Sequence, residues 1–461
     1  MDFKLVLKVM LLVSIGLAVV GFGNAQAQSG STDFRSWAPA PPMGWNSWDC
    51  YGPTVTEKEV KANADYMAAH LRESGWQYVV VDIRWYVENT SAHGYNQTAP
   101  RYVMDDYGRL LPAANRFPSA RDGAGFKPLA DYVHSLGLKF GIHVMRGVPV
   151  EAVNRHTPIP GSETAASDIY TPEDQCRWLH DMYTVVAGRD GAQSYYNSLF
   201  NLYASWGVDY VKVDDLSRPY HAAEIAMIRN AIDQCGRPIV LSMSPGPTPI
   251  EKAAHAGQHA NLWRISNDFW DRWDDVLAQF DRCRRWAPYG GPGHWPDADM
   301  LPLGRIGIRA ERGDPRMTRL THNEQITLMT LWSIFRSPLM FGGNLPDNDA
   351  FTVSLLTNKE VLFVNQHSTG NRELARSRGH VAWVADIPDG SGKYVALFNI
   401  NDPSANAGAT EPGTVSFRDI GLPDRCAVRD LWANKDLGTF SRRYTTGIPF
   451  HGAGLYKIVP E

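Results

Sequence analysis

Charged side chains stand directly after apolar stretches at several points of the sequence, where strands of a sheet would end. Lys212 and Asp214 close one of these stretches and are two residues apart, so both side chains point to the same face of a strand. An ammonium group beside a carboxylate keeps the carboxylate ionised, as a nucleophile must be. A structural ion pair at a strand end is the other interpretation of this pair. Charged residues follow other apolar stretches in the same way at Asp82, Arg264, Asp268 and Asp299.

Paired carboxylates of this kind favour the hydrolysis of glycosidic bonds. In that reaction one carboxylate attacks the anomeric carbon and a second carboxyl group protonates the leaving oxygen. No expected strand is followed by GxGxxG, and the chain has no Walker A motif, so we expect no nucleotide cofactor. His143, His294 and His322 could join aspartates in a metal site, but no HxH motif follows the first expected strand. We therefore expect neither a metal nor another cofactor.

Apolar stretches that alternate with helical patterns indicate the elements that carry these side chains. Stretches that are apolar on both faces are typical of parallel strands covered by helices. Eight such repeats favour a (β/α)8 TIM barrel over residues 28–366, with its active site at the carboxyl ends of the strands. A doubly wound open sheet is the alternative. The expected strands are 43–46, 78–85, 138–145, 208–214, 239–244, 262–266, a short piece near Trp295, and 339–342, and helices are expected at 57–74 and 221–234.

Beyond residue 366 the pattern changes to short apolar stretches separated by turns rich in Gly, Asn, Asp, Pro and Ser. This spacing predicts an antiparallel β-sandwich over residues 367–461. No pair of candidate catalytic carboxylates stands there, so this domain is expected to support the barrel. Its expected strands are 381–387, 394–400, 414–419, 427–432 and 454–459.

The first 27 residues combine Lys4 and Lys8, an apolar stretch over 9–22, and Ala-Gln-Ala at 25–27. This order is typical of a signal peptide and predicts an exported protein, periplasmic or secreted, without stable membrane insertion after cleavage. A membrane anchor is the alternative, although the apolar stretch is short for a span. The net charge of −4, from 45 basic and 49 acidic residues, argues against a nucleic-acid partner. The five cysteines are scattered and include no CxxC pair, so we expect no essential disulfide.

Several motifs, taken in order along the chain, resemble those of glycoside hydrolase family 27, the family of α-galactosidases and α-N-acetylgalactosaminidases. They are PMGWNSW at 42–48, GLKFGI at 137–142, DYVKVD at 209–214, Trp263-Arg264 with Asp268, DADML at 297–301, SPLM at 337–340, NQ at 365–366 and RDLW at 429–432. The resemblance implies a TIM barrel with a C-terminal β-sandwich, a carbohydrate substrate and a retaining double displacement.

By this resemblance Asp214 matches the nucleophile of the family and Asp268 its general acid/base. The positions that hold the sugar are matched by Trp48, Asp82, Lys212, Arg264 and Asp299. His143 stands where the family often has a tyrosine, and we include it among the sugar-binding candidates. The alternatives are core packing for Trp48, a salt bridge to a barrel aspartate for Arg264, and an ordinary hydrogen-bonded loop residue for His143.

Two departures from the family pattern bear on the identity of the sugar. Ile83 replaces the second of two adjacent aspartates that grip galactose near O4 and O6, and residues 242–247 replace a loop that reads O2. An isoleucine cannot accept a hydrogen bond from a hydroxyl group, unless Ile83 points away and Arg84, Trp85 or His143 supplies the contact.

The expected activity is therefore removal of terminal α-D-galactose by an α-galactosidase, with a β-L-arabinopyranosidase as the nearest rival. The arabinopyranose is D-galactose without its C6 hydroxymethyl group, with the same anomeric geometry. An isomaltodextranase-like glycosidase is a further alternative on the same fold. A non-catalytic carbohydrate-binding protein is the alternative from another class, and the presence of both Asp214 and Asp268 argues against it.

Overall fold

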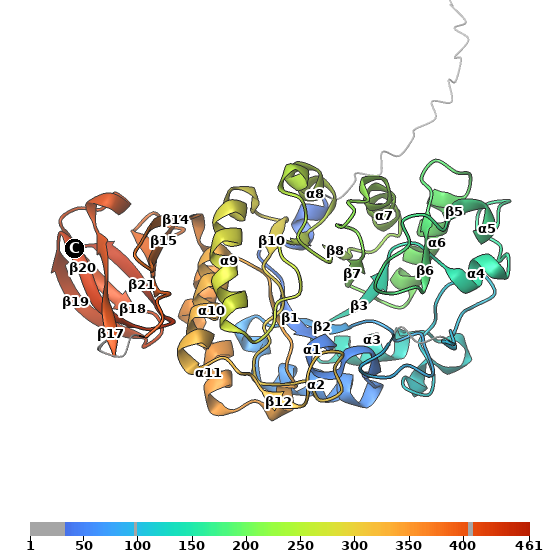
Figure 1. Ribbon diagram of the computed structural model, residues 1–461, viewed down its shortest axis with the longest axis horizontal. Helices are drawn as coiled ribbons and strands as arrows, with labels where there is room; N and C mark the ends of the chain where they lie inside the picture. Colours follow the sequence, from blue (N-terminus) through green and yellow to red (C-terminus); the bar gives the residue numbers. More distant parts are fainter. Residues whose placement is uncertain (1–32, 96–98, 404–408) are drawn as a thin grey trace, which may run out of the picture. The chain divides into compact units, whose positions relative to one another are not determined.

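The computed structural model describes residues 33–95, 99–403 and 409–461. At its centre, eight parallel strands form one curled sheet in the order β10-β9-β8-β7-β3-β2-β1-β13 (Figure 1). Hydrogen bonds from Leu301 N–H to Met340 O, 2.8 Å, and from Gly342 N–H to Leu301 O, 2.9 Å, close the sheet. These strands are β1 (Met43–Asn46), β2 (Tyr78–Val81), β3 (Lys139–Met145), β7 (Tyr210–Asp214), β8 (Val240–Met243), β9 (Leu262–Arg264), β10 (Trp295–Asp297) and β13 (Leu339–Phe341). The predicted barrel is thus confirmed.

Each barrel strand lies within or against a stretch predicted from the sequence, because strands covered on both faces are apolar throughout. Strand β2 is the main difference, since it ends at Val81 and not at residue 85. The N–H of Asp82 donates to Ser47 Oγ (2.9 Å), and the N–H of Ile83 donates to Asp82 Oδ1 (2.9 Å). Side chains therefore satisfy the backbone donors that a longer strand would have given to its neighbour.

Helices surround the barrel strands (Figure 1). Helix α2 (Glu57–His70) begins with a capping box between Thr56 and Glu59 and covers most of the helix predicted over 57–74. Helix α7 (Ala222–Gln234) matches the helix predicted over 221–234. The other helices are α1 (Trp48–Tyr51), α3 (Lys127–Ser135), α4 (Val150–Asn154), α5 (Ala166–Ile169), α6 (Ala192–Ser205), α8 (Ala253–His259), α9 (Trp273–Trp286), α10 (His322–Phe335), α11 (Ala350–Thr357) and α12 (Lys359–His367).

Small strands stiffen the long loops that follow the barrel strands. One small sheet joins strands from the loop after β3, and a two-stranded ribbon stands after β10. These strands are β4 (Val148–Pro149), β5 (Tyr170–Thr171), β6 (Met182–Val185), β11 (Arg305–Ile306) and β12 (Arg316–Met317).

The C-terminal part is an antiparallel β-sandwich of a six-stranded and a two-stranded sheet, ordered β14-β15-β16-β21-β18-β19 and β17-β20. The predicted fold of this part is confirmed, but the sequence did not indicate β14, β19 and β20. Most side chains of β14 and β19 are exposed, and β20 buries only Tyr444 and Ile448. The strands are β14 (Thr369–Ser377), β15 (His380–Asp386), β16 (Lys393–Asn399), β17 (Thr410–Ser416), β18 (Arg425–Asp430), β19 (Lys435–Ser441), β20 (Arg443–Pro449) and β21 (Gly452–Pro460).

The sandwich packs against helix α10 through strand β21 (Figure 1). Thr327 Oγ1 on α10 donates to the carbonyl of His451 (2.7 Å), and Trp432 Nε1 donates to Thr330 Oγ1 (2.9 Å). The rings of Phe280 and Phe398 meet edge to face with centroids 5.0 Å apart. Apolar contact and hydrogen bonds between polar groups therefore fasten the sandwich to the barrel.

The predicted signal peptide, residues 1–27, lies outside the described residues. Over the ranges that the structure covers, no helix is both long and apolar enough to cross a membrane. All five cysteines have free thiols: Cys50, Cys176, Cys235, Cys283 and Cys426.

Candidate active site

A cavity of about 630 Å³ lies at the carboxyl ends of the barrel strands, within the size range of small-molecule sites. We refer to it below as the strand-end cavity. Catalytic residues of barrels of this kind lie at that end of the strands. Seven of the eight site residues predicted from the sequence line it: Trp48, Asp82, Lys212, Asp214, Arg264, Asp268 and Asp299.

Asp214 is the last residue of β7 and only 9% of its surface is exposed. Its Oδ2 lies 3.0 Å from His143 Nε2, and its Oδ1 accepts the N–H of Asp215 at 2.8 Å. Burial raises the pKa of Asp214, but the bond from His143, the charge of Lys212 and the N–H of Asp215 outweigh it and lower that pKa to about 2. The carboxylate is therefore ionised across the neutral and mildly acidic range.

His143, the eighth predicted residue, is not among those that line the cavity. Its ring is fully buried on β3 and meets Asp214 through Nε2. Because an ionised carboxylate only accepts, Nε2 carries the hydrogen of this bond. His143 Nδ1 has no hydrogen-bond partner among the described residues. The structure therefore shows His143 in contact with the candidate nucleophile, and its contact with sugar stays a prediction.

Replacing His143 by Phe should move the acidic limb of kcat/KM to higher pH. Losing the hydrogen bond raises the pKa of Asp214, so the ionised nucleophile disappears earlier as the pH falls, and kcat/KM drops by about tenfold, the value of a lost bond to a charged group. His143→Gln keeps a side-chain N–H and should shift the limb less. Steady-state pH profiles of the three proteins measure this, and an unchanged limb in His143→Phe would contradict it.

Lys212 and Asp82 form an ion pair beside Asp214. Lys212 Nζ donates to Asp82 Oδ2 at 3.0 Å, and Asn46 Nδ2 donates to the same oxygen at 2.7 Å. Burial alone would neutralise both groups, but the pKa of Asp82 is lowered by Lys212, and the pKa of Lys212 is raised by Asp82 and Asp214. The pair therefore presents an ionised acceptor and a charged donor to the cavity.

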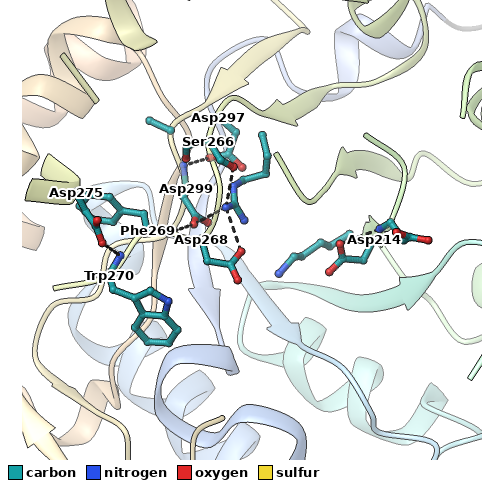
Figure 2. Close-up of polar contacts among 12 residues, drawn as sticks. Asp214, Ser266, Asp268, Phe269, Trp270, Asp275, Asp297 and Asp299 are labelled. Carbon is teal, nitrogen blue, oxygen red and sulfur yellow. Dashed lines mark hydrogen bonds and ion pairs between the residues drawn. The ribbon is translucent and has the colours of Figure 1, made fainter. Parts of the chain in front are cut away.

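Arg264, at the end of β9, holds two carboxylates at once, those of Asp268 and Asp299, which are labelled in Figure 2. Its Nη2 lies 2.7 Å from Asp299 Oδ2 and 3.3 Å from Asp268 Oδ1. The N–H of Phe269 also donates to Asp299 Oδ2, at 2.7 Å. Burial raises the pKa of Asp299 to about 7, although the Arg264 guanidinium opposes that rise. The salt bridge that was the alternative interpretation of Arg264 is present, and the residue lines the cavity as well.

Asp214 and Asp268 differ sharply in environment. The Asp268 side chain is 55% exposed, whereas that of Asp214 is 13% exposed. Figure 2 shows them on opposite sides of the site, brought there by different segments of the chain. Two carboxyl groups in unlike surroundings can divide the roles of nucleophile and proton donor.

Ile83 lines the cavity beside Asp82, with 2% of its surface exposed. Arg84 and Trp85 point elsewhere: Arg84 Nη2 pairs with Asp181 Oδ1 at 2.6 Å, and Trp85 Nε1 donates to the carbonyl of His143 at 2.7 Å. Neither of them replaces a polar contact at position 83. Ile83 therefore gives the cavity an apolar surface at this one position.

Some cavity residues were not predicted. Asp49 follows β1 and lines the cavity, and Asn46, the last residue of β1, supports it by its bond to Asp82. Polar residues at a strand end were a usable signal for both. Burial raises the pKa of Asp49 well above its usual range, with Asp299 adding to the rise. Tyr95 and Trp178 come from the long loops after β2 and β3, where no spacing marks them, and their rings meet edge to face with centroids 6.2 Å apart. No group of three or more His, Cys, Asp or Glu side chains within the described ranges could hold a metal ion.

Two family models match the chain: alpha galactosidase A over residues 178–367, and the alpha galactosidase C-terminal beta sandwich domain over 377–458. A solved structure of a GH27 β-L-arabinopyranosidase from Geobacillus stearothermophilus, in complex with arabinose, is 52% identical with a TM-score of 0.90. The similarity covers 94% of this chain and 100% of that chain. Alpha-galactosidase A of Cellvibrio japonicus is 29% identical over 97% of this chain and 98% of its own length. Alpha-galactosidase 2 of Arabidopsis thaliana is 27% identical over 91% of this chain and 90% of its own.

Proposed function

Because the chain belongs to glycoside hydrolase family 27, and so acts on O-glycosyl bonds of carbohydrates, we propose that it is a β-L-arabinopyranosidase. It would release terminal β-L-arabinopyranose from a larger glycan with retention of the anomeric configuration. The sequence alone favoured an α-galactosidase and gave the arabinopyranosidase as its rival. The similarity to the Geobacillus enzyme, at 52% identity, favours the rival.

The observation that carries this proposal is the position of Ile83. It lines the cavity next to Asp82, where the α-galactosidase pattern would supply a second carboxylate for hydroxyl groups near C6. Galactose bound there would bury a hydroxymethyl group against an apolar side chain and leave its hydroxyl unpaired, at a cost of about 1–3 kcal/mol. Arabinopyranose has no such group, so it loses nothing at this wall.

The first chemical step would use both aspartates. Asp214 attacks the anomeric carbon while the bond from that carbon to the aglycone oxygen breaks, and Asp268 gives its proton to the departing oxygen. The ionised state of Asp214 supports the first role. The exposure of Asp268 supports the second, because its carboxyl group must reach an aglycone that extends toward solvent.

In the second step a water molecule attacks the same carbon and the ester bond to Asp214 breaks. Asp268 takes the proton of that water and returns to its starting state. The ring hydroxyls would be held by acceptors on Asp82 and Asp299 and by donors on Lys212 and Arg264. Trp48, half-buried in the cavity wall, offers an apolar face to the sugar ring.

Comparing kcat/KM for p-nitrophenyl β-L-arabinopyranoside and p-nitrophenyl α-D-galactopyranoside tests the proposal. The wild type should prefer the arabinoside, and Ile83→Asp should shift the ratio toward the galactoside by about 5- to 150-fold, the equivalent of 1–3 kcal/mol. Ile83→Ala makes room for the hydroxymethyl group without adding a charge and should shift the ratio less. A wild-type preference for galactose that neither variant changes would favour the α-galactosidase and exclude position 83 as a determinant.

A further inference from the structure

Guanidinium groups gather in the outer part of the strand-end cavity. They come from the loop after β7, from the segment that follows Asp268, and from the segment that carries β12. The cavity is lined there by Arg218, Arg272, Arg312, Arg316 and Arg319. The chain as a whole has a net charge of −4, so this concentration of arginines is local.

Among the residues that the structure describes, only two of these five arginines have a carboxylate partner. Arg316 binds Asp271 through Nη2 at 2.6 Å and Nε at 2.9 Å, and Arg272 Nη2 lies 2.7 Å from Asp275 Oδ1. Asp271 is 1% exposed and also accepts the backbone N–H of Arg319 at 3.0 Å, so its oxygens are occupied. The side chains of the other three, Arg218, Arg312 and Arg319, are exposed and make no hydrogen bond or ion pair with any residue that the structure describes.

The neighbouring acids do not neutralise these groups within the cavity. Glu311 accepts the N–H of Gly94 at 3.2 Å and does not line the cavity, and Asp314 is exposed outside it. Of the carboxylates that line the cavity, Asp82 is paired with Lys212, Asp268 and Asp299 with Arg264, Asp214 with His143, and Asp271 with Arg316. Burial raises the pKa of the remaining one, Asp49, which favours its neutral form. A surplus of positive charge therefore remains in the outer part of the strand-end cavity, which we call its mouth.

The position of the segment that follows Asp268 indicates which part of a substrate, the sugar or the aglycone, these arginines would contact. The general acid must lie within hydrogen-bonding distance of the leaving oxygen, which belongs to the aglycone. Residues that lie next to Asp268 toward the solvent therefore face the aglycone and not the released sugar. Asp271, three residues further on, binds both Arg316 and the backbone of Arg319. Arg312 and Arg319 therefore belong to the aglycone side of the cavity.

We propose that this side is a subsite for an anionic sugar residue, so that the natural substrate is an acidic glycan carrying terminal arabinopyranose. The inference rests on the proposed function and extends it to the aglycone. A guanidinium matches the planar oxygens of a uronate carboxylate with two parallel N–H donors, and it also binds a sulfate ester. Both groups present anionic oxygens, which could serve as the partners that the unpaired arginines lack among the described residues.

Three matched substrates test the subsite: the 3-carboxyphenyl glycoside, its methyl ester, and the 3-sulfatophenyl glycoside. Each is prepared with β-L-arabinopyranose and, separately, with α-D-galactopyranose. The wild type should hydrolyse a charged glycoside with kcat/KM about fivefold above that of the methyl ester, typical of an exposed ion pair, and added NaCl should erase the difference. A preference for the carboxylate identifies a uronate site, and a preference for the sulfate identifies a sulfate-ester site.

The ratio of charged to neutral substrate should fall toward one in Arg312→Ala and further in the double variant with Arg319→Ala. Arg443→Ala removes an exposed arginine of the sandwich that does not line the cavity, and its ratio should equal that of the wild type. Equal kcat/KM for charged and neutral glycosides in the wild type would overturn the anionic subsite alone. Cleavage of the galactosides in place of the arabinosides would overturn the proposed sugar, while the ratio within the galactosides would still decide the subsite. Cleavage of neither sugar would overturn both.

Discussion

Asp214→Asn is expected to lower kcat by about 10³-fold or more, equal to about 4 kcal/mol of transition-state stabilisation. The amide has nearly the shape of the carboxylate but cannot supply the anion that attacks the anomeric carbon. The groups that would hold the hydroxyls, on Asp82, Lys212, Arg264 and Asp299, are unchanged, so binding of L-arabinose should change little. Steady-state kinetics on p-nitrophenyl β-L-arabinopyranoside and calorimetric titration with arabinose measure the two quantities.

Covalent trapping identifies the attacking residue directly. An activated fluoro-sugar should label the wild-type protein once, and mass spectrometry of the digested protein should place the label on Asp214. Asp215 is the adjacent control, because burial raises its pKa to about 6 and Arg146 holds it with Nη2 2.9 Å from Oδ2. A label on Asp215 or Asp299 would show that the nucleophile has been misassigned.

Asp268→Ala is expected to lower kcat/KM by about 10²- to 10⁴-fold for sugar and alkyl aglycones, the range of general acid catalysis. The oxygens of these aglycones are poor leaving groups unless they are protonated. A 2,4-dinitrophenyl aglycone departs as a stable anion, so its release should be affected far less. Added azide should restore turnover and yield a glycosyl azide, since a small anion can replace water once the base is absent.

Asp274→Ala is the matched control for Asp268→Ala, because Asp274 is an exposed carboxylate on α9 outside the cavity. It should leave both kinds of substrate unchanged. An equal loss on both aglycones in Asp268→Ala would contradict a role in protonating the leaving oxygen.

The barrel was predictable because its strands are apolar on both faces. The same apolar stretches end in Asp82, Lys212, Asp214 and Arg264, and parallel strands bring their carboxyl ends to one edge of the sheet. Residue types near strand ends therefore indicated six of the residues that line the cavity, and the family resemblance added Trp48. In the sandwich, β14 and β19 expose most of their side chains, so no apolar alternation marked them.

Contacts that depend on register or on loops were not predictable. His143 reaches Asp214 because β3 pairs with β7 in a register that sets His143 beside Lys212 and Met145 beside Asp214. One sequence does not reveal that register. The arginines of the mouth and the rings of Tyr95 and Trp178 lie on long loops, whose path depends on tertiary contacts such as the bonds of Asp271 to Arg316.

Proton NMR of the first sugar formed from p-nitrophenyl β-L-arabinopyranoside tests the central claim most directly, because it reports the substrate and the stereochemistry together. Double displacement through Asp214 predicts that β-L-arabinopyranose appears first and that the α-anomer follows only by mutarotation. Initial release of α-L-arabinopyranose would contradict the covalent mechanism, and a spectrum without arabinose would contradict the proposed substrate.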